Sequence, residues 1–339
     1  MLLFGPMEDH NQFDKYPKMD HDTKIVVIGG GHGLSTILRG LKRISENITA
    51  VVTVSDDGGS SGALRRDLGV LPPGDIRNCL AALSDDEEFL SQVLQYRFSS
   101  ETSVGGHNLG NLLLTALANI TGSFELGIQE LTRILAIHGK VTPSTLEDVN
   151  LVADVEIENN GKKECIRVFG ESNITEKNGT IRNLEIEPKN VIANPEAIKA
   201  ILAADLIALG PGSLYTSVLP NLRVNGIAQA LKASHGKIIY VCNVSTQPGE
   251  TTNFTCYDHV KVIHNAIPDV SIDGVVCNNY HEAAESKNIS WVKIEESILR
   301  EYRVFQDDLI DKAYPWRHDS NKVAEALLKA YKELGSTEN

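Results

Sequence analysis

The stretch that decides the fold is Lys24-Ile-Val-Val-Ile-Gly-Gly-Gly-His-Gly-Leu34. Its residues 25–28 form a continuous apolar run, which is typical of a strand covered on both faces of a parallel sheet. The glycines that follow predict a tight turn, and Leu34, Ile37 and Leu41 then recur on one face of a helix. This stretch therefore predicts a strand, a glycine turn and a helix, the repeating unit of an α/β fold.

The same alternation recurs along the chain. Further buried strands are expected at residues 50–54, 205–209, 238–242 and 273–277, and helices at residues 75–83, 87–98, 108–120, 124–136 and 320–334. Asn194-Pro195 predicts one more helix, with Pro at its first position, and Ser320 is the expected N-cap of the last helix. These elements predict an α/β fold with a doubly wound, mostly parallel, Rossmann-like sheet.

One segment departs from this pattern. Residues 151–187 contain short apolar runs, and Asn160-Gly161 and Asn178-Gly179 predict hairpin turns, so we expect a small antiparallel β insertion at about 151–187. Residues 1–22 are polar and aperiodic and predict a loose N-terminal extension. Residues 23–334 are expected to form one Rossmann-like nucleotide-binding domain that carries the insertion, and residues 335–339 a tail.

Composition excludes several classes of protein. The 339 residues include 32 Lys and Arg against 45 Asp and Glu, a net charge of −13, so the sequence lacks the basic footprint of a nucleic-acid-binding protein. No apolar run approaches the roughly 18–20 residues that span a bilayer, and the first residues do not form a signal peptide. Five widely spaced cysteines predict neither a disulfide framework nor a zinc knuckle. We therefore expect a cytoplasmic protein without a membrane span.

Four polar loops each follow directly after a buried strand. They are Gly29–Gly33, Asp56–Gly62, Gly210–Ser213 and Asn243–Glu250. In an open parallel sheet the carboxyl ends of the strands share one edge, and ligands bind in the crevice there. The sequence therefore predicts that the four loops converge on one ligand site.

The first loop is typical of a phosphate contact. Its glycines let a phosphate approach the N–H groups at the start of the following helix. Leu34 stands where the G-x-G-x-x-G fingerprint needs its last glycine, which disfavours a standard NAD site. A plain strand–helix turn is the alternative.

The second loop places two carboxylates before consecutive glycines. Asp56 and Asp57 are suited to bind Mg²⁺ through water or to hydrogen-bond a ribose, and the glycine and serine N–H groups after them can line an anion nest. Arg65 follows closely enough to meet a phosphate. The alternative is a turn capped by one aspartate, which leaves most of the run unexplained.

Two further segments carry candidate side chains. In Gly105–Asn111, His107 is a candidate acid, base or phosphate donor, and the two asparagines suit recognition of hydroxyl or amide groups. An Asn N-cap beside a structural histidine is the alternative. Arg317 is a cation that can close on a diphosphate, although a surface salt bridge is the commoner role of such a residue. The sequence contains no Walker loop and no zinc spacing.

Six separated motifs together make the sequence similar to a known family. They are Val27–Gly31, Ser55–Gly62, Pro73–Arg77, Gly106–Asn111, Gly210–Ser217 and Asn243–Gln247. From about Lys24 to Leu334 the chain resembles the CofD-like superfamily, and within it the bacterial branch of YvcK-type gluconeogenesis factors. The resemblance leaves residues 1–22 uncovered.

The resemblance implies two different functions. Its enzyme branch is a 2-phospho-L-lactate transferase, in which Asp56 and Asp57 would bind Mg²⁺ and the glycine loops would hold nucleotide phosphates. Its bacterial branch is associated with UDP-sugar binding, with cell shape and with growth on gluconeogenic carbon sources, without a firmly established reaction. That branch also implies that Arg317 contacts a diphosphate and that Ser320 is a phosphorylation position.

The sequence and the resemblance together predict a regulatory protein that binds a UDP-N-acetylglucosamine-like ligand, with a Mg²⁺-dependent phosphotransferase as the alternative. The candidate catalytic residues are Asp56, Asp57 and His107, and the first two are also the candidate metal ligands. The candidate ligand-binding residues are Gly30, Gly31, His32, Gly58, Gly59, Ser60, His107, Asn108, Asn111, Gly210, Gly212, Ser213, Asn243, Thr246, Gln247 and Arg317. A nucleotide sugar or dinucleotide is the expected partner, without flavin or haem as a prosthetic group, and a homo-oligomer is compatible with the sequence.

Overall fold

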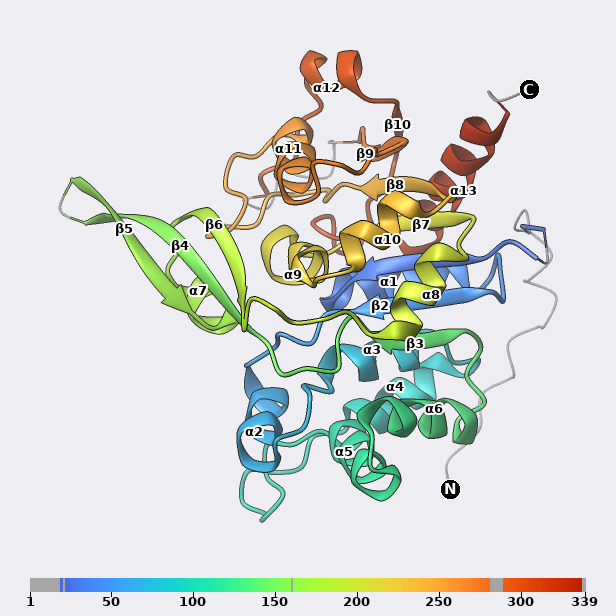
Figure 1. The fold of residues 1–339 in the computed structure, drawn as a ribbon, viewed down its shortest axis with the longest axis vertical. Coiled ribbons are helices and arrows are strands. Elements are labelled where there is room, and N and C mark those ends of the chain that lie inside the picture. The colour runs from blue at the N-terminus through green and yellow to red at the C-terminus, as the bar shows by residue number, and fades with distance from the viewer. Residues whose placement is uncertain (1–18, 21, 160, 281–288, 337–339) are drawn as a thin grey trace.

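The structure is a computed structural model, which describes residues 19–20, 22–159, 161–280 and 289–336 (Figure 1). Most of the expected N-terminal extension, residues 1–18 and 21, lies outside the described residues, as do residues 337–339 of the expected tail. Within the described part, no helix is both long enough and apolar enough to cross a membrane.

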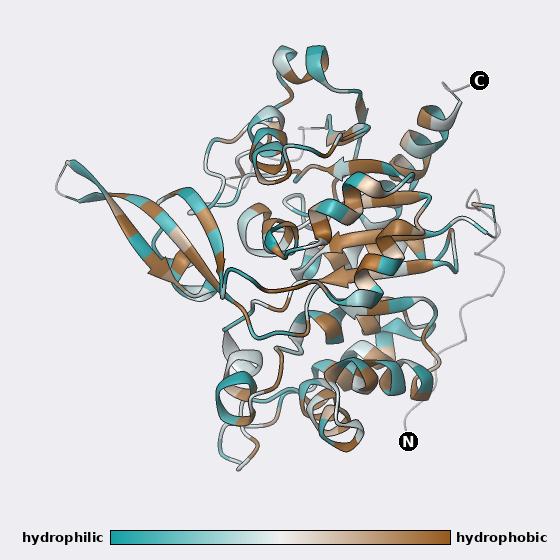
Figure 2. Cartoon of the chain, viewed as in Figure 1, coloured by the Kyte–Doolittle hydropathy of each residue, from teal (hydrophilic) through white to brown (hydrophobic). Residues whose placement is uncertain are grey.

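A seven-stranded parallel sheet forms the centre of the molecule. Its strand order is β10-β9-β8-β7-β1-β2-β3, and every neighbouring pair runs parallel. The strands are β1 (Ile25–Gly29), β2 (Ile48–Val52), β3 (Lys140–Pro143), β7 (Leu206–Leu209), β8 (Lys237–Val241), β9 (Gly274–Asn278) and β10 (Val304–Asp307). Figure 2 shows the middle of this sheet almost wholly in the hydrophobic colour, because helices cover both of its faces.

Alternate residues of each strand enter two separate cores. Ile25 and Val27 of β1 pack with α1 (Gly31–Leu41), α3 (Gly74–Ala82) and α13 (Ser320–Gly335). Val26 and Ile28 pack on the other face with α8 (Pro195–Leu202), α10 (Ile227–Ala233) and α11 (Cys256–Ala266). The two cores arise because successive side chains of a strand point to opposite faces. The sheet is therefore doubly wound, which confirms the predicted fold class.

The helices take the following bounds. They are α1 (Gly31–Leu41), α2 (Gly59–Leu68), α3 (Gly74–Ala82), α4 (Glu87–Gln95), α5 (Leu109–Thr121), α6 (Phe124–Ile134), α7 (Glu171–Glu176), α8 (Pro195–Leu202), α9 (Leu219–Arg223), α10 (Ile227–Ala233), α11 (Cys256–Ala266), α12 (Glu296–Glu301) and α13 (Ser320–Gly335), with a π-helical turn at Leu214–Val218. Asn194 caps α8 as predicted, because its side chain accepts a hydrogen bond from the Glu196 N–H at 3.0 Å.

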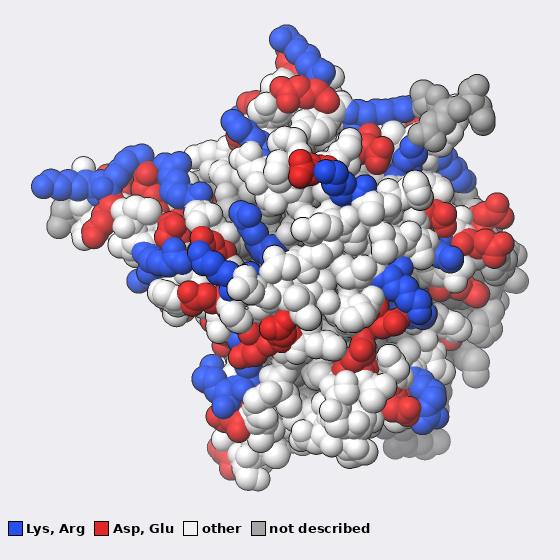
Figure 3. Space-filling view, viewed as in Figure 1, with Lys and Arg blue, Asp and Glu red and all other residues white. Residues whose placement is uncertain are grey.

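The predicted insertion is an antiparallel sheet of three strands in the order β5-β4-β6, which extends away from the main body (Figure 1). Its strands are β4 (Asn150–Asn159), β5 (Lys162–Phe169) and β6 (Thr180–Glu187). Its outer surface carries interleaved charges, as Figure 3 shows, and Glu156 pairs with both Lys163 and Arg182 at 2.9 Å. Figure 2 shows its strands striped in both colours, as expected for a sheet with one exposed face.

Two local predictions were wrong. Asn178-Gly179 is not a hairpin turn, because helix α7 lies between β5 and β6 and this dipeptide follows its end. The N-cap of α13 is Asp319 instead of Ser320, since the Asp319 carboxylate accepts hydrogen bonds from the N–H groups of Asn321 and Lys322. Ser320 is the first helical residue. The other predicted turn, Asn160-Gly161, includes Asn160, which lies outside the described residues.

Candidate functional site

A cavity of about 670 Å³ opens at the carboxyl edge of the sheet. Three of the four predicted loops line it: the start of α1 after β1, the loop after β7 and the loop after β8. The segment before α13 closes another side. The lining residues are Gly31, His32, Gly33, Thr36, Gly212, Ser213, Ser217, Asn243, Val244, Ser245, Thr246, Gln247, Pro248, Ile289, Ser290, Trp316, Arg317 and His318.

The first residues of α1 line the cavity, and no N-cap side chain caps this helix. The N-cap is Gly30, and the first helical N–H, that of Gly31, donates to Asp75 Oδ2 at 2.6 Å. A side chain at Gly33 would place its Cβ 2.5 Å from the Pro211 carbonyl oxygen, so only glycine allows the first and third loops to approach this closely. Helix N-termini of this kind favour bound anions.

Hydrogen bonds tie the third loop to the fourth. Asn243 Oδ1 accepts from the Gly212 N–H at 3.4 Å, and Asn243 Nδ2 donates to Gln247 Oε1 at 3.3 Å. The Ser213 hydroxyl donates to the carboxylate of Glu250 and accepts from the Thr216 N–H at 3.1 Å. Burial raises the pKa of Glu250 above its ordinary value, and the Ser213 hydrogen bond opposes that rise.

Arg317 supplies a cation at the mouth of the cavity. Its guanidinium lies 5.7 Å from the Tyr314 ring centroid, and among the described residues it makes no ion pair. Arg317 also lies near His32: desolvation, followed by the Arg317 charge, lowers the pKa of that imidazole. The neighbouring His318 is buried, which lowers its pKa to about 4. Its Nε2–H donates to the Cys242 carbonyl and so joins the segment before α13 to the end of β8.

A second polar group lies outside the cavity lining. Ser60, at the start of α2, accepts a hydrogen bond from Asn111 Nδ2 at 3.0 Å and makes another with His107 Nδ1 at 3.2 Å. Asn108 occupies the N-cap position of α5, but its side chain donates to the Gln95 carbonyl at 2.9 Å instead of capping that helix. This second group joins α2 to α5.

Carboxylates lie between the two groups. Asp75 is the clearest link. Its carboxylate accepts a hydrogen bond from the Gly31 N–H, and it lies close enough to Asp56 for the Asp56 charge to raise its pKa. Burial first, and then the Asp56 charge, raise the pKa of Asp75 to about 6. The pKa of Glu171, in α7, is also raised by burial and by the charges of Asp56 and Asp75. Negative charge is therefore concentrated beside the cavity.

Asp56 and Asp57 point in different directions. Asp57 Oδ1 accepts from the Ser172 backbone N–H at 3.0 Å and from its hydroxyl at 2.8 Å, so it joins the second loop to the insertion. Asp56 Oδ1 accepts from the Gly58 N–H at 2.9 Å, and Asp56 Oδ2 accepts no hydrogen bond from the described residues. In the described part of the chain, no three carboxylate oxygens gather within 4.8 Å of one another. Asp56 therefore fits a Mg²⁺ ion held by one protein carboxylate, water and phosphate oxygens, which is a common arrangement for this metal.

The predicted residues thus fall into two neighbouring sets. Those that line the cavity are Gly31, His32, Gly212, Ser213, Asn243, Thr246, Gln247 and Arg317, with Gly30 and Gly210 in the backbone directly behind them. Those in the second set are Asp56, Asp57, Gly58, Gly59, Ser60, His107, Asn108 and Asn111. The four loops therefore share one edge of the sheet but not one cavity.

Arg65 departs from its expected place. Its buried guanidinium pairs with Asp148 at 2.6 Å and donates to the Val149 carbonyl at 2.7 Å. It therefore fixes α2 to the base of the insertion instead of meeting a phosphate.

Sequence reasoning missed three residues of this region: Asp75, Glu171 and Ser217. Asp75 stands in the Pro73–Arg77 motif at the start of α3, which was a usable signal. Ser217 lines the cavity from the π-helical turn. Glu171 is brought close by the insertion, 115 positions after Asp56, and nothing in its local sequence marks it.

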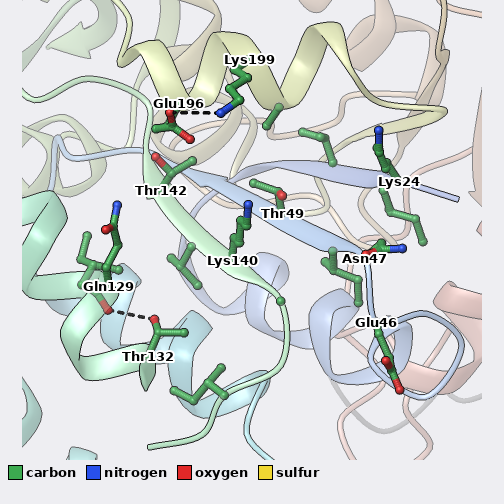
Figure 4. A pocket seen from close by; sticks show the side chains of 18 of the residues that line it. Lys24, Glu46, Asn47, Thr49, Gln129, Thr132, Lys140, Thr142, Glu196 and Lys199 are labelled. Atoms are coloured by element: carbon green, nitrogen blue, oxygen red, sulfur yellow. Dashed lines mark hydrogen bonds and ion pairs between the residues drawn. The ribbon is translucent and has the colours of Figure 1, made fainter. Parts of the chain in front are cut away.

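A larger cavity, of about 880 Å³, opens at the opposite edge of the sheet (Figure 4). It lies at the amino ends of β1, β2 and β3, between α6 and α8. Its charged side chains include Lys199, which lies 3.7 Å from Glu196, and the exposed Lys140. Among the residues described, no glycine-rich loop before a helix lines it. The smaller cavity is the better candidate because the backbone N–H groups, the glycines and Arg317 meet there.

Comparison with known proteins agrees with this architecture. Residues 25–333 match the model of the family described as 2-phospho-L-lactate transferase CofD. The gluconeogenesis factor of Bacillus subtilis is 42% identical over 325 residues, which cover 93% of this chain and 100% of that protein. The gluconeogenesis factor of Halalkalibacterium halodurans is 40% identical over 332 residues, covering 92% and 98% of the two chains.

A solved structure shares the fold. The crystal structure of a UPF0052-family protein from Bacillus halodurans superposes with a TM-score of 0.82 at 39% identity, covering 91% of this chain and 100% of that one. The family match extends over most of the sequence and includes every segment that lines the cavity. The chain therefore belongs to the CofD family.

Proposed function

We propose that this protein binds a nucleotide diphosphate sugar, of the UDP-N-acetylglucosamine class, in the cavity at the carboxyl edge of the sheet. In this proposal it is a cytoplasmic regulatory protein required for growth on gluconeogenic carbon sources and for control of cell shape. The gluconeogenesis factors of B. subtilis and H. halodurans support the metabolic part through their names. The cell-shape part rests on the resemblance to their branch.

One observation carries the binding proposal: the amino end of α1, the Gly210–Ser213 loop and Arg317 meet around a cavity of about 670 Å³. That volume is within the range of small-molecule sites. Backbone N–H groups at a helix start and a guanidinium together suit a diphosphate. The amide side chains of Asn243 and Gln247, which also line the cavity, are suited to the uracil or the sugar.

Calorimetric titration tests the proposal. The full-length protein is titrated with UDP-N-acetylglucosamine, with UDP and with N-acetylglucosamine, each with and without Mg²⁺. We expect saturable binding of the first two ligands and none of the free sugar, because the diphosphate supplies the main contacts. Absence of binding by every nucleotide sugar tested, in protein shown to be folded by circular dichroism, would contradict the proposal.

A second candidate function is a Mg²⁺-dependent phosphotransferase, and the carboxylates beside the cavity favour it. Burial first, and then the charge of Asp56, raise the pKa of Asp75 and of Glu171, so a cation beside these carboxylates would be favourable. A Mg²⁺ ion bound at Asp56 would neutralise phosphate charge when present. The chain's own residues would orient the ligand through the α1 start and hold its phosphates through Arg317.

This alternative makes a different prediction. Asp56→Asn should abolish release of a nucleoside monophosphate from a nucleotide-linked substrate while the protein stays folded. The matched variant Asp67→Asn, in the exposed last turn of α2, should keep the activity. If wild-type protein releases no nucleotide product with any acceptor hydroxyl supplied, the binding function stands alone.

Phosphorylation of Ser320 remains a prediction. Ser320 is the first residue of α13 and lies three positions after Arg317. A phosphate there would meet the amino end of α13, which favours negative charge. Phosphopeptide mass spectrometry of protein isolated from cells tests the assignment, and absence of the phosphopeptide under gluconeogenic growth would contradict it.

A further inference from the structure

Three cysteines that are far apart in the sequence meet inside the protein. Cys242 follows β8, Cys256 begins α11 and Cys277 lies in β9. Their sulfur atoms all lie within 4.8 Å of one another, and the three residues are between 0 and 2% exposed. No other group of three potential metal-ligating side chains gathers this closely in the described part of the chain.

A buried histidine beside this cluster has an unused nitrogen. His259 lies one helical turn after Cys256 on α11 and is completely buried. Its Nδ1 donates to the Thr255 carbonyl at 2.8 Å, while its Nε2 has no hydrogen-bond partner among the described residues. An unpartnered buried nitrogen is costly, so its presence calls for an explanation.

The histidine has the hydrogen-bond pattern of a metal ligand. Histidines that bind metals through one ring nitrogen nearly always donate the other N–H to a carbonyl or carboxylate, which fixes the tautomer. In His259 the Thr255 carbonyl takes this role and leaves the Nε2 lone pair available. His259 also lies within electrostatic range of the Cys242 thiol.

We propose that Cys242, Cys256 and Cys277 bind one Zn²⁺ ion, with His259 Nε2 as the fourth ligand. Three thiolates and one imidazole form a common structural zinc site, and a tetrahedral ion with zinc–sulfur bonds of about 2.3 Å holds its sulfurs about 3.8 Å apart. The three sulfurs need only a small contraction to reach that spacing, whereas His259 Nε2 lies outside the group within 4.8 Å and has to move towards the ion. Binding replaces the thiol protons, which pass to the solvent, and transfers no electrons.

The position of this site gives it a structural role. Cys242 and Cys256 enclose the segment 243–255, which contains the Asn243–Gln247 wall of the ligand cavity. Cys277 adds the neighbouring strand β9. A zinc ion would therefore hold both ends of the segment 243–255 to the sheet, and none of its four ligands is among the residues that line the cavity.

Metal analysis of the full-length protein tests the proposal. Protein expressed in zinc-supplemented medium and purified without a metal-affinity step should contain about one zinc per chain by mass spectrometry. Cys256→Ser should lower that content by about tenfold or more. The matched variant Cys79→Ser, which alters a buried thiol of α3 outside the cluster, should retain it.

A second measurement does not depend on a variant that folds. Metal-stripped, reduced wild-type protein is titrated with Co²⁺, and we expect thiolate-to-cobalt charge-transfer bands that saturate at one equivalent and disappear when Zn²⁺ is added. Wild-type protein with less than about one zinc per ten chains and no such bands would overturn the proposal. Equal zinc contents in Cys256→Ser and Cys79→Ser, or a disulfide in place of two of the three thiols, would also overturn it.

Discussion

The two edges of the central sheet carry cavities of opposite character. At the carboxyl edge, backbone N–H groups, glycines and Arg317 surround about 670 Å³. At the amino edge, apolar side chains and paired charges surround about 880 Å³. The larger cavity is lined by the sides of helices and the amino ends of strands, whereas the smaller one is lined by the start of α1 and by loops at the carboxyl ends of strands. The comparison teaches that helix starts and glycine loops, where backbone N–H groups lack partners, mark the candidate site better than volume does.

The largest effect on stability and ligand binding is expected from a substitution at Gly33, where the two loops of the carboxyl edge pack closely because glycine has no side chain. Gly33→Ala would bring a Cβ within 2.5 Å of the Pro211 carbonyl oxygen and 2.7 Å of Gly212 Cα, both in the backbone. We expect the free energy of unfolding to fall by about 3 kcal/mol and ligand binding to be lost, because one of the two loops must move. Urea denaturation and calorimetry measure the two effects.

Gly335→Ala is the matched control for this substitution. A Cβ at Gly335, near the end of α13, meets nothing within 4 Å, so that variant should be as stable as the wild type or slightly more stable. If Gly33→Ala bound ligand as tightly as the wild type, the close packing of the two loops would not matter for the site.

The next largest effect, on ligand affinity, is expected to differ between a cation at the carboxyl edge and a cation at the amino edge. Arg317→Ala should weaken binding of UDP-N-acetylglucosamine by about 10- to 100-fold, since a charge-assisted hydrogen bond to phosphate is lost. Lys140→Ala removes an exposed cation from the amino-edge cavity and should leave the affinity unchanged. Equal losses of affinity in the two variants, measured by calorimetry, would contradict the assignment of the ligand to the carboxyl-edge cavity.

A pH effect is expected from Asp75. Its pKa in the folded protein is about 6, above the ordinary value of 3.8, so the unfolded chain releases this proton at lower pH than the folded chain does. Stability from this group is therefore complete below about pH 4 and is lost as the pH rises towards and through about 6. Asp75→Asn, whose amide oxygen can still accept from the Gly31 N–H, should be about 3 kcal/mol more stable than the wild type at pH 8 and nearly equal to it at pH 4.

Thermal unfolding of both proteins across this range measures the difference. A wild type and a variant with parallel stability curves from pH 4 to pH 8 would show that Asp75 is not the group that titrates. Because a bound cation would stabilise the carboxylate, adding Mg²⁺ should reduce the advantage of Asp75→Asn if the metal binds beside it.

The smallest effect concerns the amino edge. Asn194 is buried, caps α8 and donates through Nδ2 to Glu125 at 2.7 Å and to Thr142 at 2.9 Å. Asn194→Ala should lower the free energy of unfolding by about 1 kcal/mol through loss of the cap, with ligand affinity unchanged. A measurable loss of affinity at constant stability would give the amino-edge cavity a part in ligand binding.

Much of the fold could be predicted because its signals are local. Five of the seven strands in the main sheet appear as short apolar runs, such as residues 25–28, and the carboxyl-edge loops could be found because they follow these runs directly. The edge strands β3 and β10 were not predicted, because Lys140-Val-Thr-Pro143 and Val304-Phe-Gln-Asp307 contain no such run. The prediction that loops at this edge lie together needs only the topology of a parallel sheet. The Asn194 cap was predictable because a capping side chain acts within two residues.

Long-range contacts could not be predicted in this way. Ser172, 115 positions further along the chain, donates hydrogen bonds to the Asp57 carboxylate, and Asp148 forms an ion pair with Arg65. Two side chains that were expected to contact the ligand therefore contact the insertion or its base. Nothing in the spacing of Cys242, Cys256 and Cys277 indicates that their sulfurs meet. Such contacts depend on how strands and helices pack, which a single sequence does not encode in neighbouring residues.

The most direct test of the central claim is a crystal structure of the protein with UDP-N-acetylglucosamine. We expect the diphosphate at the amino end of α1, between Gly31–Gly33 and the Gly212–Ser213 backbone, with the Arg317 guanidinium on a phosphate oxygen. Nucleotide density in the cavity formed by β1, β2 and β3 at the amino edge, with the carboxyl-edge cavity occupied only by water, would contradict the account.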